Sequence, residues 1–85
     1  MAEIEVYTTP ICPYCLSAKD LLRRKGVAFL EINVAGEPQR RAEMIARANG
    51  RTTVPQIFVG ETHVGGCDDL YALEEAGELD RLLTT

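Results

Sequence analysis

The chain has 85 residues, of which 46% are hydrophobic, and it carries a formal net charge of −4. This length supports one hydrophobic core and is too short for two ordinary domains, so we expect a single domain over residues 1–85. The negative charge argues against nucleic acid or an anionic membrane surface as partner. The acidic start MAEIEVY, together with the lack of the roughly 20-residue apolar run that a membrane-spanning helix needs, predicts a cytoplasmic protein.

The first part of the chain predicts two strands with a helix between them. Residues 3–7, EIEVY, alternate polar and apolar side chains, and residues 27–34, VAFLEINV, are rich in β-branched and aromatic types. The helix begins at Pro13 and ends before Gly26. Its apolar positions at helical spacing are Cys15, Ala18, Leu21 and Leu22. Strand, helix and strand in this order predict a βαβ unit with parallel strands.

The rest of the chain predicts a helix, a hairpin and a last helical segment. Residues 37–49, EPQRRAEMIARAN, fit a helix that ends at Gly50. PQIFV and THVGG flank Gly60-Glu61, a two-residue connection typical of a type II′ hairpin turn. From Cys67 the sequence fits a helix that breaks at Gly77 before a short final turn. The predicted order of elements is therefore βαβ-α-ββ-α.

Two of the three cysteines lie at the predicted start of the first helix, in CPYC at residues 12–15. With Pro13 in the first turn, Cys12 takes the cap position and Cys15 lies one turn further in, so the two sulfurs are neighbours. The backbone N–H groups of Tyr14 and Cys15 then point at the Cys12 sulfur, and the helix dipole favours its thiolate. Because the thiolate is the attacking species in disulfide exchange, Cys12 is the predicted nucleophile and Cys15 the resolving thiol.

Two other interpretations of the cysteines stay open on this evidence. A Cys₃His zinc site could combine Cys12, Cys15, His63 and Cys67. Alternatively, all three cysteines could be buried as small hydrophobic residues. The proline inside CPYC and the βαβ context favour a redox pair, so we expect no metal at these residues.

Three motifs occur along the chain: CPYC at residues 12–15, TVPQIF at residues 53–58 and GGCDDL at residues 65–70. In their order and spacing the chain resembles the dithiol glutaredoxins, particularly the small bacterial glutaredoxin 3 type. The resemblance covers essentially the whole chain and implies a single glutaredoxin domain over residues 1–85. It further implies an α/β, thioredoxin-like fold, with a four-stranded mixed sheet and helices on both faces.

The function that the resemblance implies is glutathione-dependent thiol–disulfide exchange. Cys12 and Cys15 would be catalytic, glutathione would be the reductant, and no metal would be needed. The expected partners are glutathione and disulfide-containing or glutathionylated proteins, with ribonucleotide reductase as one candidate, and the expected state is a monomer. Two alternatives are a glutathione-ligated iron–sulfur dimer that uses Cys12, and a thioredoxin-like reductase that is not supplied by glutathione.

The resemblance also implies which residues bind glutathione: Tyr14, Thr53, Val54, Pro55, Gly66, Cys67 and Asp68. To these we add Arg51 as a predicted glutathione-binding cation, for the reason given below. Val54 would pair through its backbone with the cysteine of glutathione, before a cis peptide bond to Pro55. The backbone N–H groups of Cys67 and Asp68, at a helix start, would hold the γ-glutamyl carboxylate. The alternative is that Asp68 and its acidic neighbour only complement the helix dipole. The Cys67 thiol itself is expected to be packed and without a redox role.

One departure from the family pattern bears directly on glutathione binding. Dithiol glutaredoxins commonly carry a lysine three residues before the first motif cysteine, where it helps to receive the glycine carboxylate of glutathione, and here that residue is Thr9. We therefore predict that Arg51, just before TTVP, or Arg47 on the preceding helix supplies the missing cation. His63 is interpreted as a solvated strand residue without a role.

Overall fold

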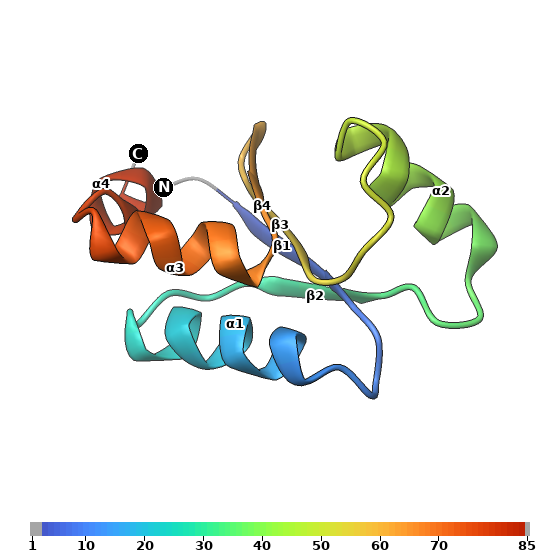
Figure 1. Cartoon of the computed structure of the whole chain (residues 1–85), viewed down its shortest axis with the longest axis horizontal. Coiled ribbons are helices and arrows are strands. Elements are labelled where there is room, and N and C mark those ends of the chain that lie inside the picture. Colours follow the sequence, from blue (N-terminus) through green and yellow to red (C-terminus); the bar gives the residue numbers. More distant parts are fainter. Residues whose placement is uncertain (1–2, 85) are drawn as a thin grey trace.

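The computed structural model describes residues 3–84, and its strands form one four-stranded mixed sheet (Figure 1). The strands are β1 (Ile4–Thr8), β2 (Leu30–Asn33), β3 (Gln56–Val59) and β4 (Thr62–Gly65). The helices are α1 (Pro13–Arg24), α2 (Pro38–Arg47), α3 (Cys67–Glu75) and α4 (Leu79–Leu83). The strand order is β2-β1-β3-β4, with β1 parallel to β2 and antiparallel to β3, and β3 antiparallel to β4. This confirms the predicted βαβ unit, the hairpin and the thioredoxin-like fold.

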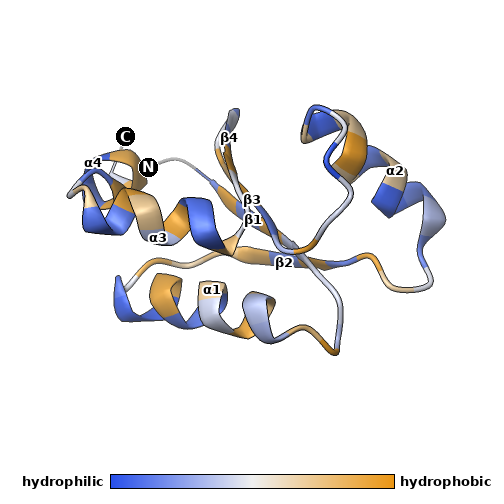
Figure 2. Ribbon diagram, in the orientation of Figure 1, coloured by the Kyte–Doolittle hydropathy of each residue, from blue (hydrophilic) through white to orange (hydrophobic). Residues whose placement is uncertain are grey.

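Two hydrophobic cores cover the two faces of the sheet, because successive strand residues point to opposite sides. Ile57 of β3 packs on the side of α1, α3 and α4, together with Leu22 and Leu70. Its neighbour Phe58 faces α2, where it packs with Tyr7 and Met44. In Figure 2 the apolar positions of the helices accordingly lie along the sides that face the sheet, with hydrophilic residues between them. The sheet therefore holds α1 and α2 on opposite faces, as expected.

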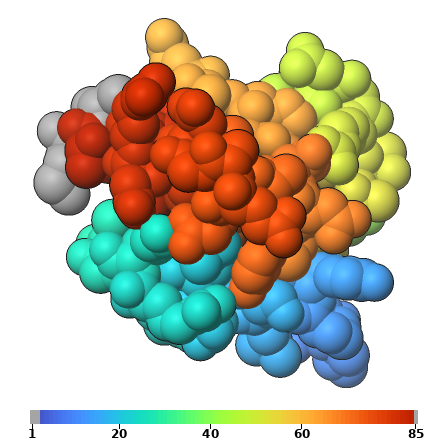
Figure 3. Space-filling view, turned by 60° about the vertical axis from the view of Figure 1, so that its left-hand side comes forward, coloured from blue at the N-terminus to red at the C-terminus, as the bar shows by residue number. Residues whose placement is uncertain are grey.

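Helix packing brings an early segment of the chain, α1, against a late one, α3. Helix α1 begins at Pro13, as predicted, and its residues Ala18, Leu21 and Leu22 are buried. α1 contacts α3, and Figure 3 shows α3 and α4 beside the segment that contains α1. Two chemically important helix starts, those of α1 and α3, are thus held in one layer. Within residues 3–84, no helix is both long enough and apolar enough to cross a membrane.

Two elements are shorter than predicted by more than one residue. The strand predicted over residues 27–34 is observed only as Leu30–Asn33, because pairing with its parallel partner β1 begins at Leu30, opposite Glu5, and ends at Asn33, opposite Thr8. The helix predicted over residues 37–49 ends at Arg47. Asn49 and Gly50 follow with φ of 57° and 91°, a left-handed conformation that ends a helix and that asparagine tolerates.

The hairpin has the predicted turn. Gly60 has φ of 60°, and among residues 3–84 the only non-glycine residue with positive φ is Asn49, so Glu61 keeps a negative φ, as a type II′ turn requires. The pairing of β3 with β4 shifts register between Ile57 and Phe58. This shift places His63 opposite Phe58 and brings Gly65 opposite Ile57, next to the start of α3.

Candidate active site

Cys12 and Cys15 form a disulfide at the N-terminus of α1, with 5.2 Å between their Cα atoms. Cys12 is the helix cap, in extended conformation, and the Cys15 N–H donates to the Cys12 Sγ at 3.1 Å. Cys12 is 9% exposed and Cys15 is 1% exposed. The first cysteine is therefore the one that a substrate can reach, and it lies where the helix dipole and a backbone N–H stabilise a thiolate.

The loop between α2 and β3 lies directly against the first cysteine. The Sγ of Cys12 is 3.8 Å from the carbonyl oxygen of Val54, although the two residues are 42 positions apart. The peptide bond between Val54 and Pro55 is cis, which confirms the expected isomer. The backbone of Val54 is thus within reach of a molecule attached to the Cys12 sulfur.

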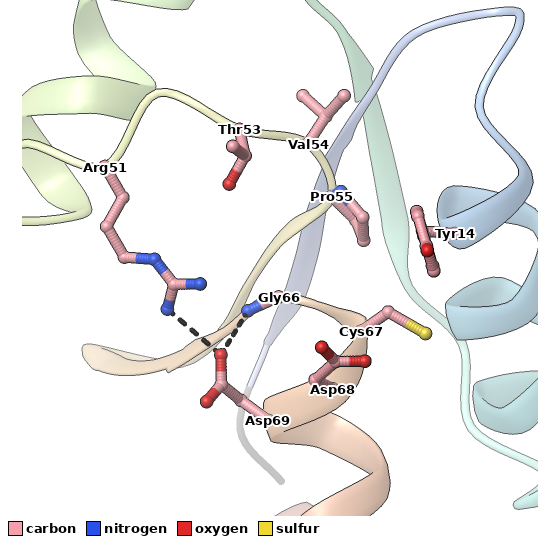
Figure 4. Close-up of a pocket in the computed structure, with 9 residues that line it drawn as sticks. All are labelled: Tyr14, Arg51, Thr53, Val54, Pro55, Gly66, Cys67, Asp68 and Asp69. Atoms are coloured by element: carbon pink, nitrogen blue, oxygen red, sulfur yellow. Dashed lines mark hydrogen bonds and ion pairs between the residues drawn. The ribbon is translucent and has the colours of Figure 1, made fainter.

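A cavity of about 240 Å³ adjoins this loop (Figure 4). Its lining residues are Tyr14, Arg51, Thr53, Val54, Pro55, Gly66, Cys67, Asp68 and Asp69. They come from α1, from the loop before β3 and from the start of α3. All eight residues that were predicted to bind glutathione are in this set, and one further residue, Asp69, joins them.

The start of α3 is fixed by the side chain of Asp69. Its Oδ2 accepts hydrogen bonds from the Gly66 N–H at 2.8 Å and from Nη1 of Arg51 at 3.0 Å (Figure 4). The hydrogen bond from Gly66, followed by that from Arg51, lowers the pKa of the Asp69 carboxyl group. Asp69 therefore stays ionised and ties the loop before β3 to the helix.

Backbone donors face the cavity at the same helix start. The first α-helical hydrogen bond of α3 runs from the Leu70 N–H to the Gly66 carbonyl, at 3.0 Å. The N–H groups of Cys67 and Asp68 precede it and so have no partner inside the helix. Such N–H groups, with the positive end of the helix dipole, form a place that favours a carboxylate.

Comparison with known proteins identifies the family. The family model described as Glutaredoxin matches residues 4–64. A glutaredoxin of Pseudomonas aeruginosa is 63% identical over 84 residues, which cover 99% of this chain and 99% of the relative. The chain belongs to the glutaredoxin family. Glutaredoxin 3 of Escherichia coli strain K12 is 58% identical over 83 residues, which cover 98% of this chain and 99% of that one.

Solved glutaredoxin structures have the same fold. The solution structure of glutaredoxin from Brucella melitensis has a TM-score of 0.86 and 59% identity, covering 98% of this chain and 89% of that chain. A crystal structure of a buckwheat glutaredoxin–glutathione complex has a TM-score of 0.86 and 30% identity, covering 98% and 77%. Glutaredoxins are thiol–disulfide oxidoreductases, and the Cys12–Cys15 pair gives this chain the redox-active dithiol of that chemistry.

Arg51 and Arg47, the two predicted cations for the glycine carboxylate, have different surroundings. Arg51 lines the cavity, with its side chain 47% exposed. Arg47 instead donates from Nη1 to the Tyr7 hydroxyl at 2.8 Å and from Nη2 to Glu5 at 2.9 Å. Its guanidinium also lies 4.1 Å from the centre of the Phe58 ring. Of the two arginines, Arg51 is the one at this cavity.

Cys67 lines the cavity but has the properties of a packed thiol. It is 8% exposed, and burial, with a smaller contribution from the charge of Asp68, raises the pKa of its thiol. Residues 3–84 contain no group of three or more His, Cys, Asp or Glu side chains arranged to hold a metal ion. His63, the fourth member of the zinc alternative, bonds through Nε2 to Oε1 of Gln56 at 2.7 Å.

Two features of the site were not found from the sequence. The contact of Asp69 with the Gly66 N–H could have been, because an acid three residues after a helix cap commonly bonds back to the cap N–H. The part-buried contact of Gln56 with His63 could not have been, because it depends on the register of two strands and on the Gln56 side chain, which also bonds to Thr53 in the loop. Both features hold the segment that lines the cavity.

Proposed function

We propose that this glutaredoxin takes its electrons from glutathione, which binds in the cavity beside Cys12. The observation that carries the proposal is the convergence of three features: a reachable cysteine, the backbone of Val54 beside it, and the helix-start N–H groups of Cys67 and Asp68. The buckwheat glutaredoxin–glutathione complex, which has the same fold, supports this choice of ligand.

In the proposed complex, the glutathione sulfur is bonded to Cys12 and its cysteine backbone pairs with Val54. The γ-glutamyl carboxylate then accepts from the N–H groups of Cys67 and Asp68, and its ammonium lies near the Asp68 carboxylate. The glycine carboxylate lies toward Arg51, whose guanidinium flanks Gly66 and Asp69 at the edge of the cavity (Figure 4). Each of the two carboxylates of the tripeptide is thus assigned its own donor.

The proposed cycle uses the two cysteines unequally. The Cys12 thiolate attacks a protein disulfide, releases one protein thiolate and forms a mixed disulfide. The Cys15 thiolate then attacks the Cys12 sulfur, which releases the second protein thiolate and leaves the Cys12–Cys15 disulfide. Two glutathione molecules reduce that bond and leave as glutathione disulfide. With a glutathionylated protein, Cys12 takes up the glutathione directly. Ribonucleotide reductase and glutathionylated enzymes remain predicted substrates.

A coupled assay tests the electron donor. The reduced protein, glutathione, glutathione reductase and a small mixed disulfide are combined, and NADPH consumption is followed. We expect turnover that saturates with the mixed disulfide and depends on glutathione. Turnover that required an enzymatic donor instead would favour the thioredoxin-like alternative, and visible absorbance of the purified protein would favour the iron–sulfur alternative.

Removing the Arg51 guanidinium should weaken the use of glutathione. In Arg51→Ala we expect the glutathione concentration for half-maximal turnover to rise about two- to tenfold, since a hydrogen-bonded ion pair at a half-exposed rim contributes about 0.4–1.4 kcal/mol. The effect should shrink as ionic strength rises, because salt screens exposed charges. Steady-state kinetics at two salt concentrations measure both changes.

Arg40→Ala is the matched control for this change. It removes the same charge from an exposed position of α2 that pairs only loosely with Glu37, at 3.9 Å, and does not line the cavity. We expect its glutathione dependence to equal that of the unmodified protein. If Arg51→Ala and Arg40→Ala behave alike, Arg51 does not receive the glycine carboxylate.

A further inference from the structure

A chain of part-buried hydrogen bonds runs from the hairpin to the loop that lines the cavity. Gln56, at the start of β3, is 0% exposed. Its Nε2 lies 3.0 Å from the carbonyl oxygen of Thr53 and 3.3 Å from the Thr53 hydroxyl. Its Oε1 lies 2.7 Å from Nε2 of His63 on β4. The imidazole also stacks on Phe58, with 4.9 Å between ring centres and 23° between planes.

The chemistry of these groups fixes the direction of each hydrogen bond. A carbonyl oxygen can only accept, so the amide nitrogen of Gln56 must be the end that faces Thr53. The Gln56 oxygen, which can only accept, then faces His63, so Nε2 of His63 carries the proton. Neutral His63 is therefore the Nε2–H tautomer. Burial, followed by the charge of Arg51, lowers the pKa of His63, which favours this neutral form.

Without His63, the amide oxygen of Gln56 would lose its hydrogen-bond donor. A completely buried amide oxygen that loses its donor must stay unpaired or rotate, and a rotation would remove the bond to Thr53 as well. Thr53 and the next residue, Val54, line the cavity, and the Val54 carbonyl lies 3.8 Å from the Cys12 sulfur. A substitution at His63 can thus alter the backbone that lines the cavity, because the Gln56 side chain contacts both His63 and Thr53.

We infer that His63 is a positioning residue, which, through Gln56, holds the Thr53–Val54 backbone in the geometry that glutathione needs. This inference rests on the proposed function, because it assigns the backbone of Val54 to glutathione. It differs from the sequence-based interpretation of His63 as a solvated residue without a role. His63 does not touch the reacting sulfurs and acts only through the orientation of the loop.

Two substitutions at position 63 separate the hydrogen bond from the packing of the ring. His63→Phe keeps a flat ring on Phe58 but has no donor for Gln56. His63→Gln places an amide N–H at about the reach of the imidazole Nε2 and restores the donor. The Cys12–Cys15 disulfide of each protein is reduced with glutathione and, separately, with dithiothreitol, which has no peptide backbone to pair with Val54. Thermal unfolding is recorded for each variant.

The expected result is a selective defect that the conservative variant rescues. His63→Phe should need roughly three- to tenfold more glutathione for half-maximal rate, as for the loss of one hydrogen bond. Its rate with dithiothreitol should be unchanged, and His63→Gln should be within about twofold of the unmodified protein on both reductants.

Three results would overturn the inference. The first is unchanged glutathione dependence in His63→Phe. The second is an equal slowing with both reductants, which would make His63 merely structural. The third is a failure of His63→Gln to restore what His63→Phe loses. If the unmodified protein itself showed no saturable dependence on glutathione, the proposed function would fail and this inference with it, so the two failures are distinguishable.

Discussion

Cys12→Ser should abolish both the reduction of protein disulfides and the removal of glutathione from proteins. We expect a loss of at least about 10³-fold, because every step of the proposed cycle passes through the Cys12 sulfur and a serine hydroxyl is not ionised at the helix start. No second thiol can replace it: Cys15 is 1% exposed, and burial raises the pKa of the Cys67 thiol. The measurement is the coupled assay with a glutathionylated peptide and with a protein disulfide.

Cys15→Ser is the comparison that makes this result specific. It also removes one sulfur, but it keeps the backbone N–H at position 15 that donates to the Cys12 Sγ at 3.1 Å. We expect Cys15→Ser to keep most deglutathionylation and to lose most reduction of protein disulfides, because only the second reaction needs a resolving thiol. Substantial turnover in Cys12→Ser together with its loss in Cys15→Ser would reverse the two roles.

Local sequence signals predicted most of the fold because each acts over a few residues. Pro13 can occupy a first helical turn, and Gly60 can adopt the positive φ of a type II′ turn, so both boundaries were placed correctly. The length of β2 was not predictable in this way. Residues 27–29 have strand-like side chains, but a strand also needs a paired neighbour, and β1 pairs with β2 only from Glu5, which lies opposite Leu30.

The predictions for the site differ in the same way: features set by local sequence were predicted, and those set by long-range contacts were not. CPYC predicted a reachable Cys12 next to a buried Cys15, because a helix start fixes both positions. The choice between Arg47 and Arg51 needed the tertiary structure: both precede Pro55 closely, yet only Arg51 lines the cavity, since Glu5 and Tyr7 on β1 bind the other guanidinium. Long-range side-chain contacts of this kind have no signature in the order of residues.

Gly65 is the backbone position whose change should cost the most stability. Its φ is 114°, outside the range of ordinary side chains, and an added Cβ would meet Oδ2 of Asp69 and lie 2.8 Å from Nη1 of Arg51. Gly65→Ala should therefore strain the turn before α3 and displace the Asp69 carboxylate that caps it. We expect a loss of about 2–3 kcal/mol in the free energy of unfolding, which for a domain of this size lowers the melting temperature by roughly 10–20 °C.

The next residue provides the matched control, since Gly66→Ala adds the same methyl group one position further along. Gly66 has φ of −92° and ψ of −168°, which alanine adopts readily, and its Cβ would lie 3.5 Å from the nearest atoms, Nη2 of Arg51 and the Pro55 carbonyl oxygen. We expect the free energy of unfolding of Gly66→Ala to stay within about 1 kcal/mol of the unmodified protein. Thermal and denaturant unfolding of the reduced proteins, followed by circular dichroism, measure the difference. If the two variants have equal melting temperatures, the prediction is wrong. Neither the positive φ of Gly65 nor the position of the Asp69 carboxylate would then stabilise this turn.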